Sequence, residues 1–240
     1  MQAVGRYAFV LALTFAASAL AAPLGPGVLD APEQTPPAAA PPVALPPPPP
    51  PAPLTLEQLS AQIDPTIVTL SAEFGLYGVA GTGFVVDPDG LVLTNFHVVE
   101  EATDITAVHQ GNGLIYDASV LGYDRTRDLA VLQLATASNL QVAAIGTSAN
   151  VAVGDPVTAV GNADGAGALV PAPGKIVALD RSVLAQSSVN GSRNELTGMI
   201  QIDADVRSGD SGGPLVDAWG SVIGVDAAGL SEGARQTQAP

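Results

Sequence analysis

The chain lacks cysteine altogether and is poor in histidine and in aromatic residues, which make up 4% of its 240 residues. Without cysteine it has no disulfide framework, no thiolate zinc site and no cysteine nucleophile. Its two histidines are too few for a histidine metal cluster. We therefore expect no metal site, and any strong nucleophile must be a serine or a threonine.

Cations are scarce as well, because 8 Lys and Arg stand against 23 Asp and Glu and give a formal net charge of -15. A surface that binds nucleic acid needs clustered cations to neutralise the phosphates and release their counterions. We therefore exclude nucleic acid as a partner.

Long apolar runs are missing except at the N-terminus, where Arg6 precedes a run of apolar and small residues from Tyr7 to Ala22. The run is short for a membrane span, which needs about 20 apolar residues, and Ala19-Leu20-Ala21 resembles a signal-peptidase site. The pattern predicts a signal peptide over residues 1–21, a secreted or extracytoplasmic location, and no membrane span after its removal. The alternative is an uncleaved N-terminal anchor.

Proline and glycine are abundant, with 21 and 26 residues. Residues 22–53 are dominated by Pro and Ala, include an unbroken proline run over residues 46–51, and show no hydrophobic periodicity. Because proline fixes φ and lacks an amide donor, we expect an extended polyproline II linker there. A spacer is the favoured role of this linker, and binding by a proline-reading partner is the alternative.

The folded domain is expected over residues 54–240. It opens with a short helix that is capped by Thr55 and ended by Pro65. Short segments rich in β-branched residues follow, separated by turns such as Asp87-Pro88-Asp89-Gly90. The predicted strands are 67–70, 79–86, 91–94, 105–109, 118–122, 129–134, 156–161, 175–184, 199–204, 214–216 and 221–227. This spacing predicts an all-β fold, either a sandwich, a barrel or two packed barrels.

The strongest motif is Gly209-Asp210-Ser211-Gly212-Gly213-Pro214, which lies between two predicted strands. Glycines around a serine allow a tight turn whose amides point inward. The N–H groups of Gly209 and Ser211 can then meet a developing oxyanion while the Ser211 hydroxyl faces the same atom. The motif predicts a nucleophilic serine with an oxyanion hole, and an ordinary glycine-rich turn is the alternative.

A serine nucleophile needs a base, and the base needs an acid to orient it. His97 is the favoured base because it lies where a strand gives way to a helical turn, whereas His109 ends a polar strand. Asp128 is the favoured acid, since it directly precedes an apolar strand and can enter the edge of the core, while Asp124 stays in solvent. The alternative for Asp128 is a turn-capping role.

The chain resembles the HtrA/DegP-type trypsin-like serine proteases, and within that family it is most similar to the secreted PepA-type proteases of mycobacteria. The resemblance covers residues 54–228 and rests on three blocks that carry His, Asp and Ser in the family's order. These blocks are residues 94–99, 124–132 and 209–214, and residues 81–87 and 154–162 resemble further strands of the family.

The resemblance implies a trypsin-like double β-barrel, with two six-stranded antiparallel barrels and the site between them. It implies that His97 accepts the proton of Ser211, that Asp128 orients His97, and that no cofactor is needed. The activity would be that of an exported serine endopeptidase that cleaves polypeptide substrates through an acyl-enzyme. The alternative is a catalytically impaired relative that acts as a secreted binding or antigen-like domain; a wall spacer would explain the leader but not the three blocks.

Two features depart from the family pattern. Asp210 stands where HtrA relatives usually carry Asn, and the polar segment 229–238 matches neither the closing strand nor the PDZ domain that the resemblance implies. We therefore expect the second barrel to be incomplete at its C-terminus, with an unpaired edge on the strand at 199–204 or at 221–227.

The substrate pocket is expected around three residues. In trypsin-like proteins its floor lies a few residues before the serine, here at Asp205, and its wall lies on the following strand, here at Val225 and Ala227. This apolar wall predicts cleavage after Val, Ala or Ile, whereas an inward Asp205 would select Arg or Lys. We favour the aliphatic pocket because an unpaired buried carboxylate is costly.

Overall fold

The computed structural model describes residues 8–12, 52–186 and 193–227 of the chain. The predicted signal peptide, the proline-rich linker and the polar tail lie outside the described residues, apart from residues 8–12 and 52–53. For residues 8–12 the description concerns the backbone.

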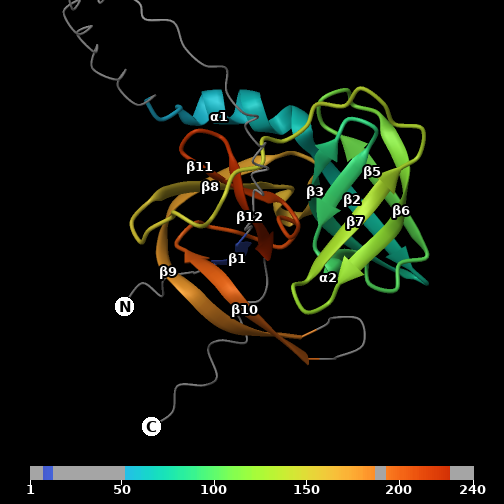
Figure 1. Cartoon of the computed structure of the whole chain (residues 1–240). Helices are drawn as coiled ribbons and strands as arrows, with labels where there is room; N and C mark the ends of the chain where they lie inside the picture. The colour runs from blue at the N-terminus through green and yellow to red at the C-terminus, as the bar shows by residue number, and fades with distance from the viewer. Residues whose placement is uncertain (1–7, 13–51, 187–192, 228–240) are drawn as a thin grey trace, which may run out of the picture. The chain divides into compact units, whose positions relative to one another are not determined.

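Six antiparallel strands form the first barrel (Figure 1). They are β2 (Ile67–Phe74), β3 (Tyr77–Asp87), β4 (Leu91–Thr94), β5 (Asp104–His109), β6 (Ile115–Asp124) and β7 (Leu129–Leu134). The order is β2-β3-β4-β7-β6-β5, and pairing of β2 with β5 closes the barrel. Apolar residues alternate along β5 and β7, which sends Ile105, Ala107, Ala130 and Leu132 into the core.

The second barrel is built from β8 (Pro156–Gly161), β9 (Val170–Gln186), β10 (Arg193–Ile202), β11 (Pro214–Asp217) and β12 (Val222–Ala227). These five strands form one curled sheet in the order β10-β9-β8-β11-β12. The sixth strand is β1 (Ala8–Ala12), which pairs antiparallel with both β10 and β12 and closes the ring. The prediction of an all-β double barrel is confirmed.

The closing strand of the second barrel differs from the expected architecture. We expected β10 or β12 to keep an unpaired edge, but β1 covers both edges. Uniformly apolar composition without alternation made residues 8–12 typical of a signal peptide, so their pattern gave no indication of a strand.

A buried cluster joins the two barrels and the first helix, α1 (Leu56–Ile63). Thr55 and Gln58 cap α1 reciprocally, and the 3₁₀ turn η1 (Asp64–Thr66) follows it. The cluster includes Leu59 and Ile63 of α1, Phe84 of β3, and Val160 and Val225 of the second barrel. Among the residues that the structure describes, no helix is long and apolar enough to cross a membrane.

Candidate active site

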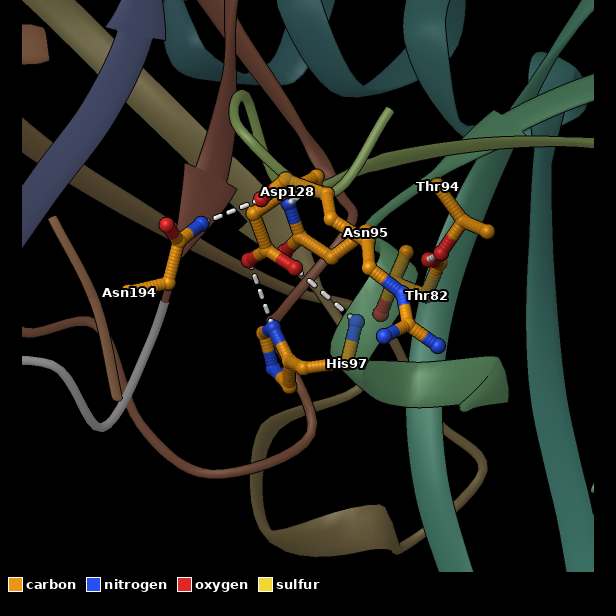
Figure 2. Close-up of polar contacts among 7 residues, drawn as sticks. Thr82, Thr94, Asn95, His97, Asp128 and Asn194 are labelled. Atoms are coloured by element: carbon orange, nitrogen blue, oxygen red, sulfur yellow. Dashed lines mark hydrogen bonds and ion pairs between the residues drawn. The ribbon is translucent and has the colours of Figure 1, made fainter. Parts of the chain in front are cut away.

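The side chains of His97 and Asp128 are in direct contact at one end of the first barrel (Figure 2). His97 lies in α2 (Phe96–Val99), the single helical turn after β4, and Asp128 immediately precedes β7, which pairs with β4. His97 Nδ1 is 2.7 Å from Asp128 Oδ2, and the His97 backbone N–H donates to Asp128 Oδ1 at 2.9 Å. The structure therefore brings together the two residues that the sequence proposed as base and acid.

The backbone of Asp128 is shaped for this contact. Its φ is +54°, a left-handed conformation that aspartate tolerates better than most residues. Its carbonyl accepts hydrogen bonds from Asn95 Nδ2 at 2.9 Å and from the Phe96 N–H at 3.1 Å. Asp128 thus holds the start of α2 with its main chain and His97 with its side chain.

Aromatic and polar contacts stabilise the turn that leads into Asp128. The Arg125 guanidinium lies 5.0 Å from the centre of the Phe96 ring and 5.6 Å from that of Tyr123. Asn194 of β10 donates from its amide nitrogen to the Arg125 carbonyl, so the second barrel contacts this turn.

The surroundings of His97 favour its charged form. Burial lowers the pKa of His97, but the charge and hydrogen bond of Asp128 and the charge of Glu100 outweigh it, so that the pKa is raised. Because a carboxylate only accepts hydrogen bonds, the proton of neutral His97 is assigned to Nδ1, and Nε2 is the atom that can act as a base. His109, the other histidine, is buried in β5, binds the Asn112 N–H, and has a pKa lowered by burial.

Ser211 lies in a tight turn that packs against the first barrel. Its carbonyl accepts the Thr82 N–H at 2.8 Å, and the Thr82 hydroxyl donates to the Gly209 carbonyl at 2.7 Å. The same hydroxyl accepts the Asn162 N–H at 2.9 Å. Thr82 of β3 therefore ties the nucleophile turn, residues 209–213, to the barrel that carries His97.

Gly212 of the nucleophile turn also lies close to the first barrel. Its φ is +86°, and a Cβ atom there would lie 2.2 Å from the Thr82 carbonyl oxygen and 2.2 Å from Thr94 Oγ1. The backbone nitrogen of Asn95 would be 3.0 Å away. Only glycine allows the residue after Ser211 to lie so near the start of α2, two residues before His97.

The Gly209 amide has a defined direction. The Ser208 carbonyl accepts the Asp164 N–H at 2.7 Å, in the 3₁₀ turn η2 (Ala163–Gly165). In a trans peptide the C=O and the following N–H point in opposite directions. The Gly209 N–H therefore points away from the Asp164 N–H of η2.

The three expected pocket residues lie in different surroundings. Asp205 lines a hollow of about 170 Å³ together with Arg207, Asp210 and residues 170–173, and its carboxylate is 2.7 Å from Arg207 Nη2. Val225 is fully buried in the cluster that joins the barrels, and Ala227 is buried against Val183, Leu196 and Met199. The structure does not bring the three residues into one lining.

Sequence reasoning missed Thr82, Thr94 and Asn95 as parts of the site. Their hydrogen bonds reach Gly209, Asp128 and each other across long sequence separations. The small-residue string Gly81-Thr82-Gly83 within a strand was the available signal, because glycines in a strand often mark a close backbone approach. In the described parts of the chain, no group of three or more His, Cys, Asp or Glu could hold a metal ion.

Comparison with known proteins matches residues 81–225 to the model of the trypsin-like peptidase domain. The chain belongs to this family. The peptidase domain is 32% identical over 195 residues to the serine protease PepD of Mycobacterium tuberculosis, covering 78% of this chain and 42% of the relative. It is 40% identical over 154 residues to a relative named a probable periplasmic serine endoprotease, DegP-like, of Chlamydia pneumoniae, covering 64% of this chain and 29% of the relative.

A solved structure gives the same answer for the fold of the peptidase domain. The crystal structure of the serine endoprotease from Yersinia pestis superposes with a TM-score of 0.58 at 30% identity, covering 72% of this chain and 57% of that one. The chain spans less than half the length of the curated relatives named above. The predicted resemblance to HtrA/DegP-type proteases is confirmed for the peptidase domain.

Proposed function

We propose that this chain is an exported serine endopeptidase that hydrolyses peptide bonds through Ser211, His97 and Asp128. The observation that carries the proposal is the 2.7 Å pair of His97 and a buried Asp128, next to a turn that the fold itself presses against α2. The names of the relatives as serine proteases support it. Export is supported by the leader pattern in residues 1–21.

The proposed reaction has two halves, the acylation of Ser211 and the hydrolysis of the acyl-enzyme, and the same residues act in both. His97 Nε2 takes the proton of Ser211 Oγ as that oxygen attacks the carbonyl carbon, and Asp128 stabilises the imidazolium. The N–H groups of Gly209 and Ser211 receive the oxyanion. His97 then protonates the leaving amine, and a water molecule activated by the same His97 hydrolyses the acyl-enzyme.

The substrate class is proposed as polypeptides cleaved after Val, Ala or Ile. Asp205 carries the support, because Arg207 binds its carboxylate through Nε and Nη2 and so competes with any cationic side chain of a substrate. Cleavage of a peptide library measures this preference directly. A profile dominated by Arg or Lys would instead assign Asp205 to the pocket floor.

A fluorophosphonate probe tests the catalytic proposal, since it labels a serine that a neighbouring base activates. We expect labelling of the wild-type chain and of Ser208→Ala, a matched change at an exposed serine of the same segment. Ser211→Ala should not be labelled and should lose about 10⁶ in kcat, with little further loss when His97→Ala is added. Absence of labelling in folded wild-type protein would favour the alternative, a non-catalytic binding domain.

A further inference from the structure

Two buried carboxyl groups that the triad does not use flank the nucleophile turn. Asp210 directly precedes Ser211 and is 2% exposed, and Asp226 of β12 is 1% exposed. The Asp226 carbonyl accepts the Gly212 N–H at 2.8 Å, and the Asp226 N–H donates to the Gly213 carbonyl at 2.8 Å. The Gly213 N–H donates to the Asp210 carbonyl at 2.9 Å. The two aspartates are therefore held on either side of the same short stretch of backbone.

The side-chain oxygens of these aspartates are largely without partners. Asp210 Oδ2 accepts the Arg207 N–H at 2.8 Å, but Oδ1 accepts no hydrogen bond within the described part of the chain. Neither carboxyl oxygen of Asp226 accepts one there. Gly161 of β8 lies beside Asp210 Oδ1, because a Cβ on that glycine would lie 2.6 Å from the oxygen. Buried polar atoms without partners are costly, so such a cluster needs an explanation.

Burial and the neighbouring charges shift the pKa of both carboxyl groups. Burial raises the pKa of Asp226 well above its ordinary value, and the charge of Asp210 raises it further. Burial also raises the pKa of Asp210 to about 6; Asp164 and Asp205 add to this, while the Arg207 N–H and charge oppose it. The Arg207 guanidinium is engaged with Asp205 and Asp164. Burial and the charge of Asp210 thus favour the protonated form of Asp226, whereas Asp210, with a pKa of about 6, is largely ionised at neutral pH.

A protonated carboxyl carries an O–H donor, and an ionised carboxylate carries only acceptors. We propose that Asp226 donates this O–H to the unpartnered Oδ1 of Asp210, and that this shared proton positions the turn that presents Ser211. Asp226 is then a positioning residue for the reaction, and the inference rests on the proposed function only for its activity readout. When the shared proton is lost in alkaline solution, two buried like charges face each other and the turn loosens.

Substitutions at Asp226 separate a donor from a mere space-filling role. Asp226→Asn keeps a neutral donor of the same shape at every pH. Asp226→Leu removes the donor and fills the same space with an apolar side chain. Asp180→Asn is the matched control, because Asp180 is an exposed aspartate of β9 in the same barrel. Probe labelling of Ser211 and kcat/KM are measured over roughly pH 5 to pH 10 for all four proteins.

We expect wild type and Asp180→Asn to lose activity on the alkaline side, and Asp226→Asn to keep its activity there. Asp226→Leu should be slower at every pH, by about tenfold for one lost buried hydrogen bond. An alkaline loss shared by wild type and Asp226→Asn would overturn the proposal. Equal rates for Asp226→Leu and Asp226→Asn would overturn it as well, because they would reduce Asp226 to a space-filling residue.

Stability measured in the Ser211→Ala background tests the pair without any catalysis. A carboxyl whose pKa is raised on folding stabilises the folded state at low pH, and this contribution is lost as pH rises through the raised pKa. The unfolding free energy in urea should therefore fall as pH rises from about 4 through 6, and it should fall less in Asp226→Asn. If this holds while the wild-type chain hydrolyses nothing, the pair stands and the proposed function fails. Identical pH dependence in the two proteins removes the pair, whatever the activity.

Discussion

At the scale of single residues, Thr82 connects the nucleophile turn to the barrel that carries His97 and Asp128. Its hydroxyl accepts from Asn162 and donates to Gly209, and its N–H donates to the Ser211 carbonyl. All of these groups are buried, so loss of the hydroxyl would leave a donor and an acceptor without partners.

Thr82→Val removes the hydroxyl without changing the size of the side chain. We expect it to lower the unfolding free energy by roughly 1–3 kcal/mol and to slow the labelling of Ser211, because Gly209 loses its anchor. Thr82→Ser keeps the hydroxyl and is the control. Urea unfolding and probe labelling measure the two effects, and a Thr82→Val protein indistinguishable from Thr82→Ser would contradict this role.

His97 determines how activity depends on acidity. Its pKa is raised above 6.5 by Asp128 and Glu100 against the lowering effect of burial, and only the neutral ring can accept the proton of Ser211. As pH drops, activity should therefore fall at a pH above 6.5, which is higher than for an exposed histidine.

Asp128→Asn tests the origin of this shift, because it removes the charge that favours protonated His97. We expect the acid limb of kcat/KM to move to lower pH while kcat falls strongly, since the ring loses its fixed tautomer. The pH–rate profiles of the two proteins provide the measurement. An acid limb that stays in place would assign the raised pKa to a different group.

At the scale of structural elements, the nucleophile turn depends on how closely its backbone approaches β3 and β4. Gly212→Ala combines a positive φ with a Cβ atom that would overlap Thr82 and Thr94. We expect it to destabilise the fold by more than 1 kcal/mol, on the order of other strained core changes, and to abolish labelling. Gly122→Ala in β6 is the control, since nothing lies within 4 Å of its Cβ position. Thermal unfolding compares them, and equal midpoints would contradict the close approach.

Strand patterns in the sequence predicted some elements to the residue and missed parts of others. The ends of β4, β7 and β8 agree with the prediction, because apolar alternation and turn residues bound them closely. The prediction began β9 at Lys175, but the strand starts at Val170. This half of β9 contains Pro171 and Pro173, which lack an N–H. It pairs with β8 alone, and such an edge tolerates proline.

In the candidate site, too, some residues could be predicted from local sequence and others could not. His97, Asp128 and Ser211 stand in local motifs whose chemistry is readable, and the structure places His97 against Asp128 as expected. The role of Thr82 depends on Gly209, 127 residues further along the chain. The role proposed for Asp226 depends on Gly212 and Gly213, to which its backbone is hydrogen-bonded. The glycines beside Thr82 could indicate a close backbone approach, but no local pattern encodes which distant backbone will lie against a residue, so these partners could not be predicted.

At the scale of the whole molecule, β1 is the element that the rest of the second barrel depends on. It runs between β10 and β12 and supplies hydrogen-bonding partners to both. A chain that begins at residue 53 should therefore exchange the amide hydrogens of β10 and β12 faster than the full chain does. Exchange in β5 of the first barrel, which β1 does not pair with, serves as the internal reference. Equal protection of β10 and β12 in both chains would show that another segment covers them.

The position of β1 also bears on when the second barrel can close. Export machinery reads a leader while it is extended and accessible, but residues 8–12 are paired on both edges once the second barrel has closed. Residues 8–12 also lie within the proposed signal peptide, and they cannot be read as an extended leader while they are paired within the barrel. If the proposed export occurs, we therefore expect late closure of the second barrel to favour it.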